Sequence, residues 1–146
     1  MNKELIINVT SNEITIALFE DKQLVELNKE KCKTGFAVGD IYLGKVKKIM
    51  PGLNAAFVNV GYEKDAFIHY LDLGPQFTTQ QKLVNILTNN KKIPNFETMR
   101  LDKAMGKNGK ISGFIASGQS ILVQIAKEAI STKGPRLTCD MSLAGR

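Results

Sequence analysis

The sequence predicts a mainly β protein, and three observations lead to that prediction. Apolar and polar residues alternate over short runs through most of the chain, which is the period of a half-buried strand. Turn-forming pairs such as Pro51-Gly52 separate these runs. Apolar residues at helical spacing are confined to one segment, residues 79–92. The strands therefore carry the fold, and the helical segment is an insertion among them.

The composition is that of a folded, basic protein. The chain has 146 residues, 43% of them hydrophobic, so a core is possible and global disorder is excluded. The net charge of +6 favours a polyanionic partner such as RNA, DNA or an anionic membrane surface, although a basic protein with no such partner has the same charge. Cys32 and Cys139 form no CxxC pair and are read as reduced thiols of a cytoplasmic protein. There is no apolar run near 18 residues and no signal peptide, so we expect no membrane association.

The first 30 residues predict a meander of three strands, at residues 4–10, 13–20 and 23–30. Ser11-Asn12 and Asp21-Lys22 supply the turns. The middle strand is apolar on both faces, which implies cover on both sides. Because three strands cannot cover themselves, we expect them to lie against the rest of the chain or to belong to a sheet that is completed elsewhere.

After a linker at residues 31–38, five further strands are predicted. They lie at residues 41–50, 53–60, 66–70, 120–126 and 136–143. Gly44 marks a bend or a close backbone approach in the first of these strands. Pro51-Gly52 fits the central positions of a type II turn, in which glycine accepts a positive φ.

Residues 71–118 interrupt the β pattern. They predict a helix at 79–92 with Thr78 or Thr79 as its N-cap, followed by a flexible stretch, rich in lysine and glycine, at 100–110. Five strands with an excursion between the third and fourth indicate an OB-fold, a Greek-key barrel whose exposed strand face binds oligonucleotides. We therefore expect a meander at residues 1–34 and a barrel at 35–146, with a variable insertion at about 74–117.

Two phenylalanines are predicted to face solvent from this barrel. Side chains alternate along a strand, and the uniformly apolar row of Ala56, Val58 and Val60 is assigned inward. Phe57 then points outward, with Phe67 and His69 beside it on the next strand. The alternative is a reversed register that buries both rings, as most strand phenylalanines are buried.

Cations surround the two rings and complete a candidate site for single-stranded nucleic acid. Bases stack on exposed aromatic rings while phosphates bind lysine and arginine. If about four cations contact phosphates, the log–log salt slope of binding should be near −3. A surface charge without a role is the competing reading for any single lysine. The predicted RNA-binding residues are Phe57, Phe67, His69, Lys45, Lys127, Lys133 and Arg136.

The residues give no indication of catalysis or of a bound metal. His69 is the single histidine and has no neighbour at metal-ligand spacing, so we expect no zinc site. The aspartates are scattered, whereas a metal-dependent nuclease needs carboxylates that converge on magnesium. From the residues alone, the chain is a binding module without catalytic residues and without a cofactor.

The block from residue 39 to residue 73 resembles the S1 RNA-binding domain of the ribonuclease E/G family. The shared motifs are Ile41-Tyr42-x-Gly44-Lys45-Val46, Met50-Pro51-Gly52-Leu53-x-Ala55-Ala56-Phe57-Val58-Asn59-Val60-Gly61 and Lys64-x-Ala66-Phe67-Ile68-His69. The ending Phe67-Ile68-His69 is more similar to the ribonuclease G branch. The resemblance continues through Val123-Gln124-Ile125-x-Lys127 and Thr132-Lys133-Gly134-x-Arg136.

The resemblance implies the RNA-binding part of a bacterial, cytoplasmic endoribonuclease that acts in ribosomal RNA processing and messenger RNA decay. It matches the family's RNA-contacting aromatics to Phe57 and Phe67, and its contacting lysines to Lys127 and Lys133. It also implies that the meander belongs to a ribonuclease-H-like domain completed downstream. The family's magnesium-binding aspartates and zinc-linking cysteines would then lie beyond Arg146. We accordingly expect a homo-oligomeric full-length enzyme and no activity of this chain alone.

Two other functions stay open on the sequence. One is a stand-alone S1-type RNA-binding or translation-associated protein with no enzymatic parent. The other is an interaction module whose exposed aromatics dock another protein. Binding of RNA that falls steeply with salt separates the RNA-binding functions from docking, because a hydrophobic docking site is nearly insensitive to salt.

Overall fold

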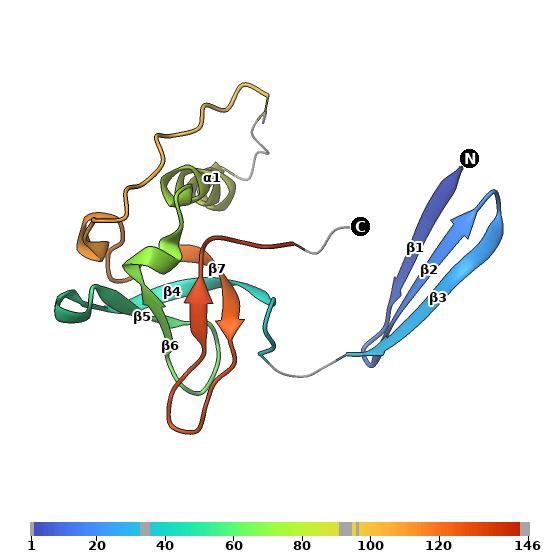
Figure 1. Cartoon of the computed structure of the whole chain (residues 1–146), viewed down its shortest axis with the longest axis horizontal. Coiled ribbons are helices and arrows are strands. Elements are labelled where there is room, and N and C mark those ends of the chain that lie inside the picture. Colours follow the sequence, from blue (N-terminus) through green and yellow to red (C-terminus); the bar gives the residue numbers. More distant parts are fainter. Residues whose placement is uncertain (1, 33–35, 91–94, 96, 144–146) are drawn as a thin grey trace. The chain divides into compact units, whose positions relative to one another are not determined.

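A computed structural model describes residues 2–32, 36–90, 95 and 97–143 of the chain (Figure 1). The chain divides into two compact units, Met1–Gly35 and Phe36–Arg146. Part of the predicted linker, residues 33–35, lies outside the described residues. Each unit has its own sheet, so each is described by itself.

The first unit is the predicted meander. Its strands are β1 (Lys3–Val9), β2 (Glu13–Glu20) and β3 (Gln23–Lys31), which pair antiparallel in the order β1-β2-β3. Asp21 and Lys22 connect β2 to β3 with φ angles of 47° and 68°. Two successive positive φ angles match the twist of a tight hairpin, so the predicted turn is confirmed.

Many apolar side chains of this small sheet are exposed, because three strands have no second layer of their own. All eight residues of β2 are partly buried, whereas β1 is exposed along its whole length. The exposed apolar residues on β1 and β3 are Leu5, Ile6, Ile7, Val9, Leu24, Val25 and Leu27. Membership of a larger ribonuclease-H-like sheet stays a prediction.

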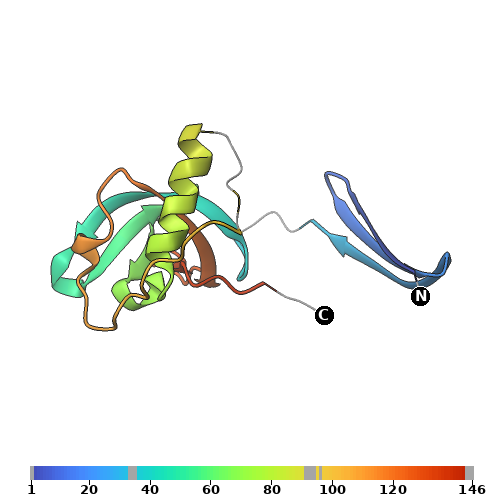
Figure 2. The same ribbon diagram turned by 90° about the horizontal axis from the view of Figure 1, so that it is seen from above.

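The second unit is a closed five-stranded barrel with one α-helix (Figures 1 and 2). Its strands are β4 (Ile41–Met50), β5 (Ala55–Asn59), β6 (Ala66–His69), β7 (Ser120–Lys127) and β8 (Arg136–Thr138). They close in the order β4-β5-β6-β8-β7, with β6 and β8 parallel and the other pairs antiparallel. This architecture is consistent with the OB-fold that the sequence predicts.

Branched aliphatic side chains from all five strands fill the barrel. Gly44 on β4 is required inside it, because a Cβ at this position would lie 2.6 Å from Cγ1 of Val58. The predicted close approach at Gly44 is thus confirmed. Residues with essentially no exposed surface include Val46, Val58, Ile68, Ile121, Val123, Ile125 and Leu137.

The structure corrects three local predictions. Pro51-Gly52 opens a 3-10 helix (Pro51–Leu53) in place of a type II turn, and Asn54 adopts the positive φ, 49°. Helix α1 (Phe77–Asn90) begins before Thr78 and Thr79, so neither threonine is its N-cap. The last strand ends at Thr138, five residues before its predicted end. Each error lies at a boundary, where tertiary contacts override local preference.

The insertion after the third barrel strand is irregular beyond α1, as predicted, but it is tied to the barrel rather than free. The hydroxyl of Tyr70 donates a hydrogen bond of 2.6 Å to the carbonyl of Gly106, and the amide of Met105 donates to the carbonyl of Pro75. Ile111, at its far end, is buried in the core. The predicted helix end at residue 92 lies outside the described residues.

Candidate nucleic-acid interface

Strand register brings two phenylalanines, two lysines and one arginine into one line across the barrel. Lys48 on β4 pairs with Phe57 on β5, and Phe57 pairs with Phe67 on β6. Phe67 pairs with Arg136 on β8, which in turn pairs with Lys127 on β7. Directly paired residues share a face of a sheet. The barrel therefore displays two aromatic rings flanked by cations on one outer face.

The two rings are partly buried and form an edge-to-face pair. The ring centroids of Phe57 and Phe67 are 6.1 Å apart, with an interplanar angle of 68°. Ala56 and Val58 are fully buried on the opposite face of β5, and Val60 is 8% exposed. The burial of this row confirms the predicted register and shows that the reversed register is wrong. Ala55 is an exception, because it lies in the row of Phe57 and is nevertheless buried.

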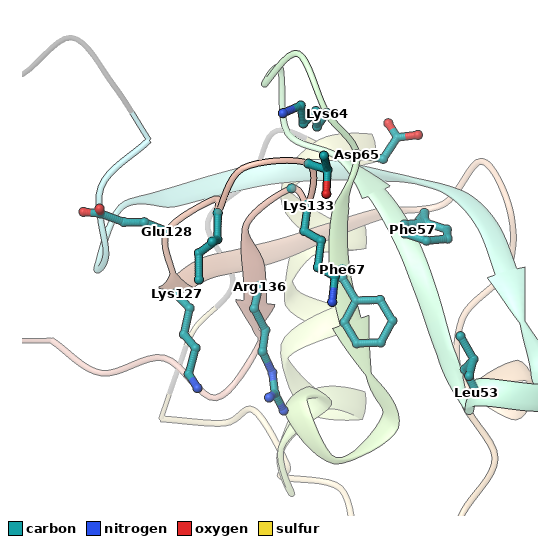
Figure 3. A pocket seen from close by; sticks show the side chains of 12 residues that line it. Leu53, Phe57, Lys64, Asp65, Phe67, Lys127, Glu128, Lys133 and Arg136 are labelled. Carbon is teal, nitrogen blue, oxygen red and sulfur yellow. The ribbon is translucent and has the colours of Figure 1, made fainter.

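An open pocket of about 790 Å³ lies over this face (Figure 3). Figure 3 shows Lys133 extending beside the ring of Phe67, while Lys127 and Arg136 project in parallel from the neighbouring strands. The lining residues come from the strands, the 3-10 helix between β4 and β5, the β5–β6 loop and the β7–β8 hairpin: Leu53, Phe57, Lys64, Asp65, Phe67, Lys127, Glu128, Ile130, Thr132, Lys133, Gly134 and Arg136. An apolar floor with cations above it suits a base and its phosphate together.

The cations of the pocket differ in how they are held. Arg136 donates from Nε and Nη2 to the two carboxylate oxygens of Asp72, at 3.1 and 3.0 Å. These hydrogen bonds and the charge of Asp72 raise the pKa of Arg136 above its ordinary value. Lys127 and Lys133 have no ion pair among the residues that the structure describes. Both lysine ammonium groups are thus available to a phosphate.

A tight turn places Lys133 at the pocket. Ile130 and Lys133 exchange backbone hydrogen bonds of 3.1 and 2.8 Å, and Ser131 between them has a φ of 47°. Gly134 then packs so closely on the backbone of Asp65 that a Cβ would collide with the carbonyl oxygen of Asp65. The hairpin is therefore fixed against the loop before β6 by a contact that only glycine permits.

Two predicted RNA-binding residues do not line the pocket. Lys45 is exposed and lies farther along β4, paired with Asn59 and Ser120. His69 accepts a hydrogen bond from the amide of Leu71 at its Nδ1, and so caps a 3-10 helix, Tyr70–Leu73. A capping role explains a histidine at this position without any ligand.

The sequence reasoning did not select several residues that line the pocket. Leu53 and Ile130 are apolar yet 57% and 71% exposed, and both lie in turns. Exposed aliphatic residues in turn segments are the sequence signal that could have identified them. Two acids, Asp65 and Glu128, also line the pocket. Asp65 is neutralised by Lys47 at 2.8 Å.

Searches for other kinds of site in the described residues give two findings. No group of three or more His, Cys, Asp or Glu side chains gathers there in a way that could hold a metal ion. None of the helices found in that part of the chain has the length and hydropathy to cross a membrane.

Comparison with known proteins finds relatives over nearly the whole chain, although no family model matches. The chain is 37% identical over 143 residues to ribonuclease G of Haemophilus influenzae and 32% identical over 150 residues to ribonuclease G of Escherichia coli K12. It is 38% identical over 132 residues to ribonuclease E of a Nostoc species. The alignments cover 98%, 100% and 89% of this chain, but 26%, 26% and 15% of those proteins. The chain thus spans about a quarter of the length of the ribonuclease G relatives.

Proposed function

The chain is related to the ribonuclease E/G family over nearly its whole length, and we propose that it is the single-stranded RNA-binding module of a bacterial endoribonuclease of the ribonuclease G type. The observation that carries this proposal is the line of Phe57 and Phe67 between cations on the open face of the barrel. Stacking on an aromatic ring contributes roughly 1–3 kcal/mol per base and discriminates weakly among bases. The proposed site therefore binds flexible RNA with little sequence preference.

In this mechanism each part of the pocket has one task. Bases stack on Phe57 and Phe67, while the ammonium groups of Lys127 and Lys133 bind phosphates. Arg136, held by Asp72, adds a fixed positive charge beside Phe67. Because a guanidinium has five N–H donors, Arg136 keeps donors for a phosphate after its two bonds to Asp72. The RNA is thereby held extended and unstacked.

The wider role rests on the family resemblance. We place the magnesium-dependent hydrolysis, and any zinc, outside these 146 residues, so this chain alone captures RNA and does not cleave it. The parent enzyme would act in the cytoplasm as a homo-oligomer, in ribosomal RNA processing and messenger RNA decay. A stand-alone RNA-binding or translation-associated protein is the alternative, and it would use the same pocket.

The test compares single-stranded and duplex RNA of the same length, each titrated against the chain and followed by fluorescence anisotropy. Because stacking requires unpaired bases, we expect the single strand to bind at least about tenfold more tightly, a difference of about 1.4 kcal/mol. Equal or tighter binding of the duplex would overturn the proposal. A parallel incubation with magnesium should leave the RNA intact, and reproducible cleavage that co-purifies with the chain would refute the assignment of hydrolysis to other residues.

A further inference from the structure

The insertion carries a second set of exposed cations that the pocket does not include. Arg100, Lys103, Lys107 and Lys110 are all exposed, and none has an ion pair among the described residues. The one acid between residues 100 and 110 is Asp102, which is held by Lys82 at 2.5 Å. This run is therefore a local excess of positive charge.

The far end of this run is fixed beside the pocket. Asn54 donates from Nδ2 to the carbonyl of Gly109 at 2.9 Å and accepts at Oδ1 from the amide of Ile111 at 2.7 Å. Lys110 lies between these two bonded residues, and Asn54 directly follows Leu53, which lines the pocket. In Figures 1 and 2, the orange segment around residue 111 lies beside the turn between β4 and β5. Lys110 is thus anchored where the pocket ends.

Cations border both ends of the pocket. Figure 3 shows Leu53 and Glu128 on opposite sides of the aromatic pair. The side with Glu128 combines this carboxylate, which has no cation partner among the described residues, with the cations Lys127 and Arg136. The side with Leu53 adjoins the anchored Lys110, which follows Lys107 by three residues, with no acid from residue 103 to residue 110. A polyanion that leaves the pocket meets attraction at the Leu53 end.

We infer that a single-stranded RNA longer than the pocket continues past Leu53 onto the insertion, where Lys110 and Lys107 bind its phosphates. This inference rests on the proposed function and specifies the direction and length of the bound strand. Five strands at about 4.8 Å spacing give the line a width of roughly 19 Å measured along the curved wall of the closed barrel. Sites on OB-folds extend over about 4–16 nucleotides, so the longer ones exceed a line of that width. The insertion would supply the additional contacts.

The test uses the whole 146-residue chain and two uridine oligomers, of about 4 and about 14 nucleotides, which bracket the range of such sites. The variant is Lys107→Gln/Lys110→Gln. The control is Arg100→Gln/Lys103→Gln, which removes the same charge from the same insertion near Asp102, where the chain is bonded to α1 through Thr79. Affinities are measured at several salt concentrations. The altered side chains are exposed, and unchanged thermal unfolding of both variants would verify the fold.

For the long oligomer, we expect the variant to lower the magnitude of the log–log salt slope by about 1.4, which is two contacts at about 0.7 each. The short oligomer, and the control variant with either oligomer, should keep the slope of the unmodified chain. An unchanged slope for the long oligomer, or an equal decrease in the control, would overturn the inference while leaving RNA binding intact. Failure of the unmodified chain to bind either oligomer would instead refute the proposed function.

Discussion

Phe57 and Phe67 lie on the outer face of the barrel because their strand neighbours fill its interior. Ala56, Val58 and Ile68 alternate with the two rings and have no exposed surface. The alternation leaves each ring partly buried at its base, which orients it, and partly open, which allows a base to stack. The position of these rings therefore follows from the packing of their neighbours.

A substitution at Phe57 tests whether its ring lies on the surface of the barrel or in the core. Phe57→Ala should reduce the free energy of unfolding by only about 1–2 kcal/mol, since a full burial of such a side chain is worth about 1.5–3 kcal/mol. The matched control is Ile68→Ala on the adjacent strand, where a fully buried side chain is lost at a cost of about 2–5 kcal/mol. Urea unfolding measures both. A loss above about 3 kcal/mol for Phe57→Ala would show that its ring belongs to the core.

Cys139 is a buried thiol whose titration links stability to pH. Burial, and next the charge of Asp72, raise the pKa of Cys139 from 9.0 to about 12. The folded state therefore holds the thiol proton more tightly than the unfolded state. The resulting stabilisation is fully present below pH 9 and is lost as pH rises towards 12.

The stability of the chain should accordingly decrease above pH 9 by up to about 1.4 kcal/mol per pH unit from this one group. Urea unfolding of the chain and of Cys139→Ala, compared from pH 8 upward, isolates the contribution. All other groups are identical in the two proteins, so their contributions cancel in the difference. Parallel pH dependences of the two proteins would contradict the buried, protonated state of Cys139.

At the scale of elements, the β7–β8 hairpin is the part that brings cations to the rings. The amide of Phe67 donates a hydrogen bond of 2.9 Å to the carbonyl of Pro135, which joins the hairpin to β6. Gly134 makes the close contact with Asp65 next to this bond. The position of Lys133 over Phe67 therefore depends on one glycine rather than on the lysine itself.

Gly134→Ala should displace the hairpin from Asp65 and move Lys133 away from the pocket. We expect a loss of about 1–3 kcal/mol in stability from overpacking, and a salt slope of RNA binding that is weaker by about 0.7, the value of one phosphate contact. Gly52→Ala is the matched control, because a Cβ at Gly52 meets nothing within 4 Å. If the two variants bound RNA with the same slope, the contact at Gly134 would not be what positions Lys133.

The sequence predicts all eight strands, because binary patterning is strong in short half-buried strands. Element ends were less predictable. Pro51-Gly52 predicts a type II turn, whereas the fold selects a 3-10 helix after which Asn54 can reach Gly109 and Ile111. That choice depends on residues more than 50 positions away, which local sequence does not encode.

The candidate site was predictable only in part, because strand alternation is visible in the sequence whereas long-range contacts are not. Strand alternation alone places Phe57 and Phe67 on one outer face. The ion pair of Arg136 with Asp72 joins residues 64 positions apart, and the 3-10 helix capped by His69 forms only once β6 has ended. Such contacts follow from tertiary structure. Strand alternation places His69 in the row of Phe67, but the sequence does not show that its side chain caps a 3-10 helix or that Lys45 lies outside the pocket.

At the scale of the whole molecule, the charge of +6 becomes informative only when it is placed on the fold. Cations lie on the aromatic face of the barrel and on the insertion, whereas the three-stranded sheet of the other unit exposes a largely apolar β1. The first distribution suits a flexible polyanion. The second suits contact with further protein, and membership of a larger domain stays a prediction.

The most direct test of the account is a titration of single-stranded RNA at several salt concentrations, with the chain and with Phe57→Ala/Phe67→Ala. For an oligomer that does not reach the insertion, the account predicts a log–log slope near −3 for both proteins, because the rings neutralise no phosphate. It also predicts that the variant binds more weakly by about 2–6 kcal/mol, from the loss of two stacked bases. Binding that is insensitive to salt, or an affinity that survives the loss of both rings, would contradict it.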